Sequence, residues 1–225
     1  GEYEQAREYY EESLAIEREI GDRAGEAKSL GNLGVVARNL GEYEQAREYH
    51  EESLAIEREI GDRAGEATSL NNLGTVAQSL GEYEQAREYH EESLAIKREI
   101  GDRAGESKSL DNLGSVAGQQ EDYETAEQRH REALAISDEI GDRAGVATQQ
   151  FNIGVDAQRQ DEFGRALAWF RKSRQTRGDL GADRDTLDSL GRIVRVATEL
   201  EQFETAREAC VDALELIADS DLALD

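Results

Sequence analysis

The sequence predicts an all-α fold: a right-handed solenoid of about eleven helices, stacked as antiparallel pairs in a single array over residues 1–225. Three observations lead to this prediction. The segment GEYEQAREYHEESLAIEREIGDRAGEATSLNNLGTVAQSL (41–80) recurs with a period of 40 residues, which indicates one supersecondary unit stacked on copies of itself. Apolar residues are spaced by three and four, as on one face of a helix. No stretch alternates with period two, so we expect no sheet.

The two helices of a repeat can be located from the residues that bound them. Gly21 is a signal for the end of a helix, and Asp22 is a preferred N-cap residue. A first helix, helix A, is therefore predicted from about residue 23 to 40, where Gly41 ends it. A second helix, helix B, follows from about residue 43 to 60.

The same boundaries recur along the chain, so they place every element. We expect a lone helix B, then five A–B pairs, then a short tail. The ranges are 1–20 for the lone helix, 22–60, 62–100, 102–140, 142–180 and 182–218 for the pairs, and 219–225 for the tail.

Some positions keep one small residue in every copy, which indicates that another helix crosses there at close range. Helix B carries such an alanine, and helix A carries a glycine that gives way only to Val194. An aromatic row marks the corner between the two helices. The alanines are Ala6, Ala46, Ala86, Ala126, Ala166 and Ala206; the glycines are Gly34, Gly74, Gly114 and Gly154; the row is Tyr3, Tyr43, Tyr83, Tyr123, Phe163 and Phe203.

This pattern resembles the tetratricopeptide repeat (TPR). The Leu33-Gly34 pair, the turn at 41–43 and Ala46 stand at the spacing of that family. The family's repeat has about 34 residues and usually ends near a proline; here Arg58 stands at that place and helix B continues. The 40-residue form, with its GDRAGEA linkers and Asn-Leu-Gly core, resembles the Pins/LGN scaffold and, more distantly, kinesin light chain. The resemblance implies a TPR superhelix whose helices A line the concave surface.

Composition restricts the classes of partner. The net charge is −25, from 51 acidic and 26 basic residues, which disfavours nucleic acid and anionic membranes. The acidity has two interpretations, ordinary solvation of exposed helix faces or adaptation to a high-salt cytosol. No apolar run approaches the 18 or so residues of a membrane span and no signal peptide is evident, so we expect a cytoplasmic protein. The chain begins with Gly and contains no Met, so we expect a piece of a longer protein.

The first helix is predicted to lack a partner. Its apolar residues Ala6, Leu14 and Ile16 would be half uncovered, and solenoids normally hide such faces with caps. We expect this end to dock against another copy, giving a homo-oligomer, or against an upstream helix.

Differences between neighbouring copies point to a binding face. Blocks 1–40 and 41–80 differ at six positions, and five of them lie on helix A within an arc of roughly 100°. Drift at exposed positions is one explanation. The other, which we favour because helix B has more exposed positions but only one change, is a peptide-binding groove. The six pairs are Tyr10/His50, Lys28/Thr68, Gly31/Asn71, Val35/Thr75, Arg38/Gln78 and Asn39/Ser79.

Following these positions down the chain gives the predicted groove. Basic residues outnumber acidic ones on it, so a partner segment with some acidic residues is expected. A row of asparagines beside it could pair with the backbone of an extended peptide, since an amide both donates and accepts; alternatively, each Asn bridges neighbouring helices A. The predicted peptide-binding residues are Lys28, Asn32, Val35, Arg38, Asn39, Asn71, Asn72, Thr75, Gln78, Lys108, Asp111, Asn112, Ser115, Gln119, Phe151, Asn152, Val155, Arg159 and Arg195.

Nothing in the sequence predicts an enzyme, a metal site or a cofactor. His50, His90 and His130 share one repeat position with Tyr10, Phe170 and Cys210, the single cysteine. Stacked repeats place equivalent residues about 10 Å apart, too far for ligands about 2 Å from one zinc ion. A basic stretch over 163–177 is either a second contact surface or a helix that balances acidic neighbours.

Two hypotheses for the function follow. The chain is a protein–protein interaction scaffold that binds a partner peptide or helix along helices A. The alternative is a structural or regulatory spacer within a larger signalling protein, with ends that self-associate.

Overall fold

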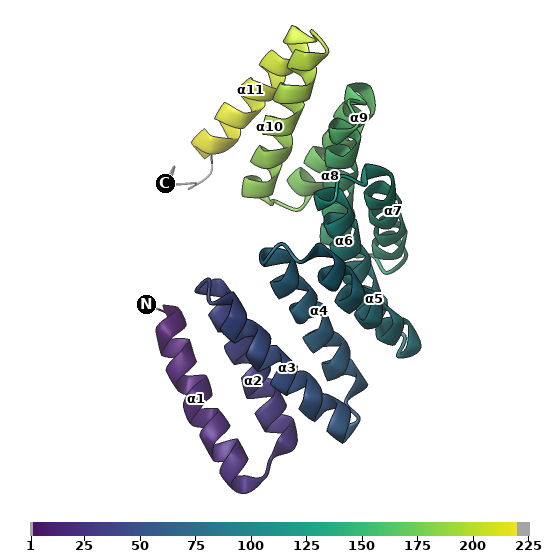
Figure 1. The fold of residues 1–225 in the computed structure, drawn as a ribbon. Helices are drawn as coiled ribbons and strands as arrows, with labels where there is room; N and C mark the ends of the chain where they lie inside the picture. The colour runs from purple at the N-terminus through teal and green to yellow at the C-terminus, as the bar shows by residue number, and fades with distance from the viewer. Residues whose placement is uncertain (1, 220–225) are drawn as a thin grey trace. The chain divides into compact units, whose positions relative to one another are not determined.

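The computed structural model describes residues 2–219, and in that part the chain folds into eleven α-helices without a strand (Figure 1). The prediction of an all-α fold built from helix pairs is confirmed. The helices are α1 (Glu2–Ile20), α2 (Arg23–Asn39), α3 (Tyr43–Ile60), α4 (Arg63–Ser79), α5 (Tyr83–Glu99), α6 (Arg103–Gln119), α7 (Tyr123–Glu139), α8 (Arg143–Arg159), α9 (Phe163–Asp179), α10 (Asp183–Glu199) and α11 (Phe203–Asp219).

The chain divides into two compact units. Unit 1 comprises residues 1–116 and holds α1 to α5 with most of α6, while unit 2 comprises residues 117–225 and holds the end of α6 with α7 to α11. Within each unit consecutive helices pack against each other, as α2 does on α3 and α8 does on α9. Odd-numbered helices correspond to the predicted helices B and even-numbered helices to helices A.

Short polar signals fix where the helices start and stop. The Asp22 side chain accepts a hydrogen bond from the Gly25 backbone N–H at 3.0 Å and so caps α2. A Cβ on Gly25 would lie only 2.6 Å from Asp22 Oδ2, which explains the glycine of the DRAG sequence. Gly41 ends the turn with φ +79°, and in the later copies Glu121 and Asp161 adopt φ of 63° and 58° at that position.

The apolar core is assembled from clusters that each draw on three or four consecutive helices. In unit 1 one cluster joins Leu14 of α1 to Leu30 and Leu33 of α2 and Ile56 of α3. In unit 2 a cluster centred on Phe170 of α9 runs through α8, α9, α10 and α11. No helix therefore buries its apolar residues against a single neighbour.

Three of the constant glycines of helix A, Gly34, Gly74 and Gly154, accommodate a ring from helix B. A Cβ on Gly34 would lie 2.5 Å from Cε1 of His50, and Gly74 stands in the same relation to His90. In unit 2 the Phe170 ring occupies this place against Gly154. Any larger residue on helix A would force the ring out of the core.

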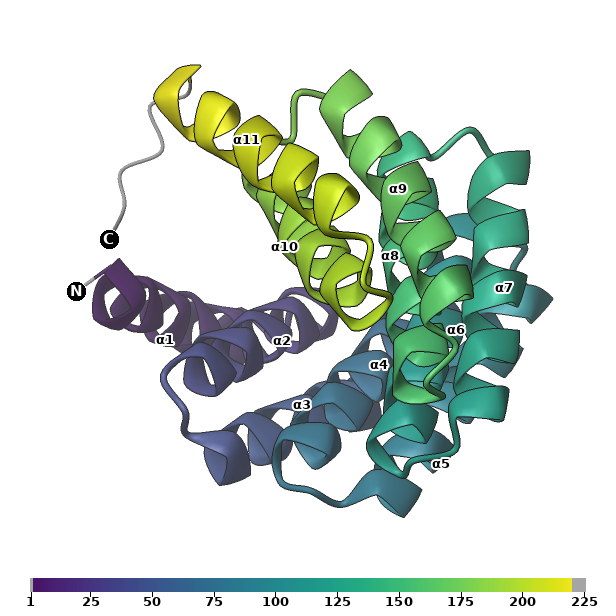
Figure 2. The same cartoon turned by 90° about the horizontal axis from the view of Figure 1, so that it is seen from above.

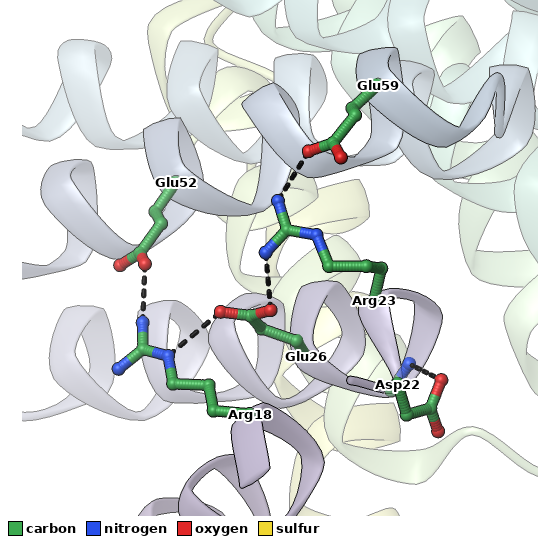
Figure 3. A network of polar contacts seen from close by, with 7 residues as sticks. Arg18, Asp22, Arg23, Glu26, Glu52 and Glu59 are labelled. Carbon is green, nitrogen blue, oxygen red and sulfur yellow. Dashed lines mark hydrogen bonds and ion pairs between the residues drawn. The ribbon is translucent and has the colours of Figure 1, made fainter. Parts of the chain in front are cut away.

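A repeated ion-pair network joins the helices in unit 1 (Figure 3). Glu26 of α2 accepts from Arg18 Nε at 2.8 Å and from Arg23 Nη1 at 2.5 Å, and these arginines continue to Glu52 and Glu59 of α3. The hydrogen bond from Arg18 is the main cause that holds the pKa of Glu26 below its usual range. The same arrangement recurs around Glu66 and Glu106, which are also buried.

The buried histidines make the stability of unit 1 dependent on pH. Burial lowers the pKa of His50 and of His90 from 6.5 to about 4, and among the described residues neither ring has a hydrogen-bond partner. Between pH 6.5 and 4 the unfolded chain binds protons that the folded chain does not. The free energy of unfolding should therefore fall as the pH falls through this window, by about 3 kcal/mol for each histidine.

Replacing both rings by phenylalanine, His50→Phe with His90→Phe, should remove this dependence, since Phe170 already fills the equivalent place. Urea denaturation at pH 7 and pH 5 measures the effect. The variant should lose less stability than the parent chain between these two values; an equal loss in both proteins would contradict the assignment.

Candidate peptide-binding site

The positions that differ between the first two copies follow the uncovered stripe of helix A. In α2 the side chains of Leu30, Leu33 and Val36 are buried in the core. None of the divergent positions 28, 31, 35, 38 and 39 is buried. In α4 the same stripe is uncovered except at Asn71, which is 8% exposed. This stripe, completed by its neighbouring asparagines, is called the A-face below.

Neighbouring helices A approach each other more closely than neighbouring helices B in unit 1. Asn112 Nδ2 of α6 donates to Asn71 Oδ1 of α4 at 2.7 Å, so two short side chains bridge the gap. Helices B are joined by longer pairs, such as Arg18 of α1 with Glu52 of α3.

The row of asparagines divides into two kinds. Asn32 and Asn72 are half-buried, and neither side chain has a hydrogen-bond partner within residues 2–219. Asn112 instead uses its amide donor on Asn71. The bridging interpretation thus applies to Asn112, while Asn32 and Asn72 keep free amide groups at the edge of the A-face.

The remaining predicted residues of unit 1 are exposed or half-buried and, apart from Val35, polar. Lys28 and Lys108 are exposed and form no ion pair with any described residue. Arg38 Nη2 lies 3.4 Å from Oδ1 of the exposed Asn39. The Thr75 hydroxyl donates to the Asn71 carbonyl at 3.0 Å. Half-buried positions on the same face are Val35, Gln78, Asp111 and Ser115.

In unit 2 the A-face centres on an aromatic side chain. The ring of Phe151 lies 5.4 Å from that of Phe170, and the guanidinium carbon of Arg177 lies 4.4 Å from the Phe151 centroid. Asn152 and Val155 are half-buried beside it, while Gln119, Arg159 and Arg195 are exposed.

The histidines at the shared repeat position and the basic stretch 163–177 lie outside the predicted groove. His130 Nδ1 lies 2.6 Å from Asp156 Oδ2 inside unit 2, and the described residues contain no group of three or more metal-ligating side chains. In the basic stretch 163–177, Arg174 pairs with Asp212 at 2.6 Å and Arg165 with Glu127. These pairs favour charge balance as the role of that stretch.

One cleft lies outside the predicted site. About 500 Å³ of space opens among α9, α10 and α11, with Leu190 and Ile193 in its wall. Ala209 and Gly178 line it where the earlier copy has Tyr89 and Arg58. A comparison of the first two copies alone gives no signal for this cleft, because both copies keep the larger residues.

In the part of the chain that the structure describes, no helix combines the length and apolarity needed to cross a membrane.

Sequence and structure comparisons identify the family. A family model, the tetratricopeptide repeat, matches residues 1–59, 26–99, 65–139 and 105–178, so most of the chain is covered. The chain belongs to the tetratricopeptide repeat family, as the residues at 33–46 predict. TPR repeats typically form non-catalytic scaffolds for protein–protein interaction. No curated protein gives a significant sequence match.

Three solved structures indicate the breadth of proteins with this fold. BtubC (BKLC) from P. vanneervenii is 18% identical with a TM-score of 0.86, covering 100% of this chain and 99% of that one. The STAND protein PH0952 from Pyrococcus horikoshii, a signal transduction ATPase with a TPR sensor, is 16% identical with a TM-score of 0.79, covering 87% of this chain and 31% of that one. A Rap protein complexed with Competence and Sporulation Factor is 14% identical with a TM-score of 0.70, covering 96% and 70%.

The two kinds of asparagine should respond differently to truncation. Asn112→Ala should lower the free energy of unfolding by about 1–3 kcal/mol, since Oδ1 of the buried Asn71 side chain loses its donor. Asn72→Ala, which breaks no internal hydrogen bond, should change it by less than about 0.5 kcal/mol. Urea denaturation of the two single variants tests the difference; equal losses would show that the Asn71–Asn112 bond does not stabilise the stack.

Proposed function

We propose that this chain is a protein-interaction scaffold that binds an extended or helical segment of a partner protein along the A-face. The observation that carries the proposal is that the differences between the first two copies follow the uncovered stripe of helix A, while helix B changes only at Tyr10/His50. Drift alone would alter both surfaces.

The chemistry of the A-face suits a peptide. Asn32 and Asn72 offer free amides at equivalent places in successive repeats, and an amide can pair with the N–H and C=O of an extended backbone whatever its sequence. Lys28 and Lys108 add unpaired positive charge. In a chain of net charge −25 these groups favour a segment with acidic residues, and the attraction will weaken as salt rises.

The neighbours with solved structures support the same function class. The Rap protein is described in complex with Competence and Sporulation Factor, and the STAND protein carries its TPR array as a sensor. We propose a non-catalytic role here as well, because the A-face presents amides, hydroxyls and exposed charges rather than an acid–base pair in an apolar pocket.

The second candidate is a spacer or self-assembly module of a larger protein. It is favoured by α1, whose Tyr9 and Ile16 are 62% and 58% exposed. These apolar side chains offer a surface for another copy or another segment.

Binding to the A-face can be tested by substituting its residues with those found at the equivalent positions of other repeats. Twelve-residue peptides are first selected from a random display library on the intact chain, and their affinities are measured by isothermal titration calorimetry. The variant Lys28→Thr, Arg38→Gln, Lys108→Thr takes its residues from Thr68, Gln78 and Thr148. It should bind the selected peptides about tenfold more weakly, because three charge contacts are removed.

A control variant matches the loss of charge on the opposite surface. Arg7→Gln, Arg47→Gln and Arg87→Gln also remove three positive charges, all from helices B. Peptide affinity should be unchanged in this control. Peptides that lose affinity with the control but not with the A-face variant would reject the proposal, as would a library that yields no binder.

A further inference from the structure

The cleft among α9, α10 and α11 is the place where the last repeat loses large side chains. Helix α10 packs on both α9 and α11 (Figure 2), and most of the lining comes from these two helices B. The cleft measures about 500 Å³, whereas the equivalent space among α3, α4 and α5 measures about 290 Å³. Smaller residues stand at three equivalent positions: Tyr89, Arg58 and Glu66 of the earlier copy become Ala209, Gly178 and Thr186.

Packing does not require the glycine that opens one side of this cleft. A Cβ on Gly178 would meet nothing beyond its own turn of helix within 4 Å. Gly154 differs, because a Cβ there would lie 2.7 Å from Cε1 of Phe170. Gly178 therefore leaves open a space that the described part of the chain does not fill.

The preceding repeat shows which side chain occupies the same position when a large one is present. Trp169 stands on α9 where Ala209 stands on α11. The guanidinium carbon of Arg131 lies 5.4 Å from the Trp169 ring, and Lys172 Nζ lies 4.1 Å from it. A cation is attracted to the electron-rich face of such a ring. The occupants of this position in the other copies are Tyr9, Tyr49, Tyr89 and Arg129.

The apolar wall of the cleft is also the wall against which this ring packs in unit 1. Leu190 and Ile193 line the cleft and are nearly fully buried. Their equivalents in unit 1 are Leu70 and Leu73. These two leucines share an apolar cluster with the partly buried Tyr89. An aromatic ring in the cleft would therefore meet the same pair of apolar side chains.

Charged groups at the rim complement an aromatic side chain that carries a polar hydrogen. Arg171 is the equivalent of Arg131, and its Nη2 donates to Thr205 Oγ1 at 3.3 Å. Glu208 also lines the cleft and forms no ion pair with a described residue. A guanidinium can lie over a ring face, and a carboxylate can accept from a phenol O–H or an indole N–H. Salt bridges neutralise the other charges of the lining: Arg174 with Asp212 at 2.6 Å, and Asp179 with Arg143 at 3.2 Å.

We propose that this cleft binds a tyrosine or tryptophan side chain of a partner protein. The partner's ring takes the place of the aromatic residue that α11 lacks, with Arg171 over its face and Glu208 accepting its polar hydrogen. Buried aromatic side chains of this kind dominate the affinity of many protein interfaces. None of the lining residues belongs to the A-face, so the cleft is a second binding surface and does not depend on the function proposed above.

Peptide selection on the full chain tests the proposal. A random library of twelve-residue peptides is selected on the intact chain and depleted on a variant whose cleft is filled. The filled variant, Gly178→Arg with Ala209→Tyr, carries the residues of Arg58 and Tyr89. The peptides that remain should contain a tyrosine or a tryptophan. Peptides that contain neither, or a selection that leaves no peptide, would overturn the proposal.

Fluorescence anisotropy with labelled forms of these peptides measures what each group contributes. Replacing the tyrosine or tryptophan by alanine should weaken binding at least about tenfold. Replacing it by phenylalanine should weaken binding about threefold, because the polar hydrogen is lost. Arg171→Gln should also cost about threefold in affinity. Equal affinities of the aromatic and alanine peptides would contradict the assignment.

A single substitution and a matched control guard against misfolding of the filled variant. Gly178→Arg alone should weaken binding about tenfold, because its side chain and the ring cannot share the space. The control Gly164→Arg adds the same side chain at another open position of α9, outside the cleft, and should leave the affinity unchanged. Equal losses in the two variants would overturn the proposal, because added charge would then explain both.

Three further results would assign these peptides or the cleft differently, and each would overturn the proposal. The A-face variant Lys28→Thr, Arg38→Gln, Lys108→Thr should bind the peptides with unchanged affinity; a loss would place them on the A-face. Free indole that binds the intact chain as tightly as the peptides would assign the cleft to a small aromatic molecule. Self-association, measured by analytical ultracentrifugation, that disappears in Gly178→Arg would assign it to another copy.

Discussion

The fold depends on one constraint: in the described part of the chain each apolar cluster is shared by three or more helices, so a single helix pair does not complete a core. Ala37, Ala46 and Val76 come from α2, α3 and α4, yet they form one small cluster that is almost fully buried. A single helix pair has too few apolar residues for a core, so stability comes from contacts between consecutive elements. This nearest-neighbour arrangement explains how a chain with only 37% apolar residues can fold.

A comparison of the first two copies shows how much a neighbouring helix adds to the burial of an apolar side chain. Helices α1 and α3 differ in sequence only at Tyr10 and His50 within 1–20 and 41–60, but Ile16 is 58% exposed and Ile56 is 2% exposed. The same side chain is thus surface or core according to what packs against it. The local sequence determines where a helix forms, and the adjoining repeat determines which of its apolar side chains are buried.

The helices could be predicted almost residue by residue because their signals are local. Asp22 and Gly41 act within a few residues of their own position, and the 40-residue period repeats each signal several times. Contacts between helices were harder to predict. The packing of the His50 ring on Gly34, and the Asn112–Asn71 bridge, require knowing which side chains of separate helices meet. The cleft among α9, α10 and α11 was missed for another reason: the first two copies both carry Tyr and Arg where Ala209 and Gly178 stand, so comparing them gives no sign of change.

The same reasoning explains why the A-face of unit 1 and the A-face of unit 2 differ in character. A position that packs against the next helix A can hold only side chains that make a favourable contact with the residue facing it on that helix. Asn112 is paired with Asn71, whereas Arg192 is paired with Phe151, so partner and occupant change together. The glycine position shows a parallel change in the sequence: in the last repeat the equivalents of Gly34 and His50 are Val194 and Cys210, and Cys210 is exposed rather than buried. Variation on the A-face is therefore constrained by packing as well as by any ligand. A pair that exchanges an amide bridge for a guanidinium over an aromatic ring keeps the helices in contact while it changes the charge presented to solvent.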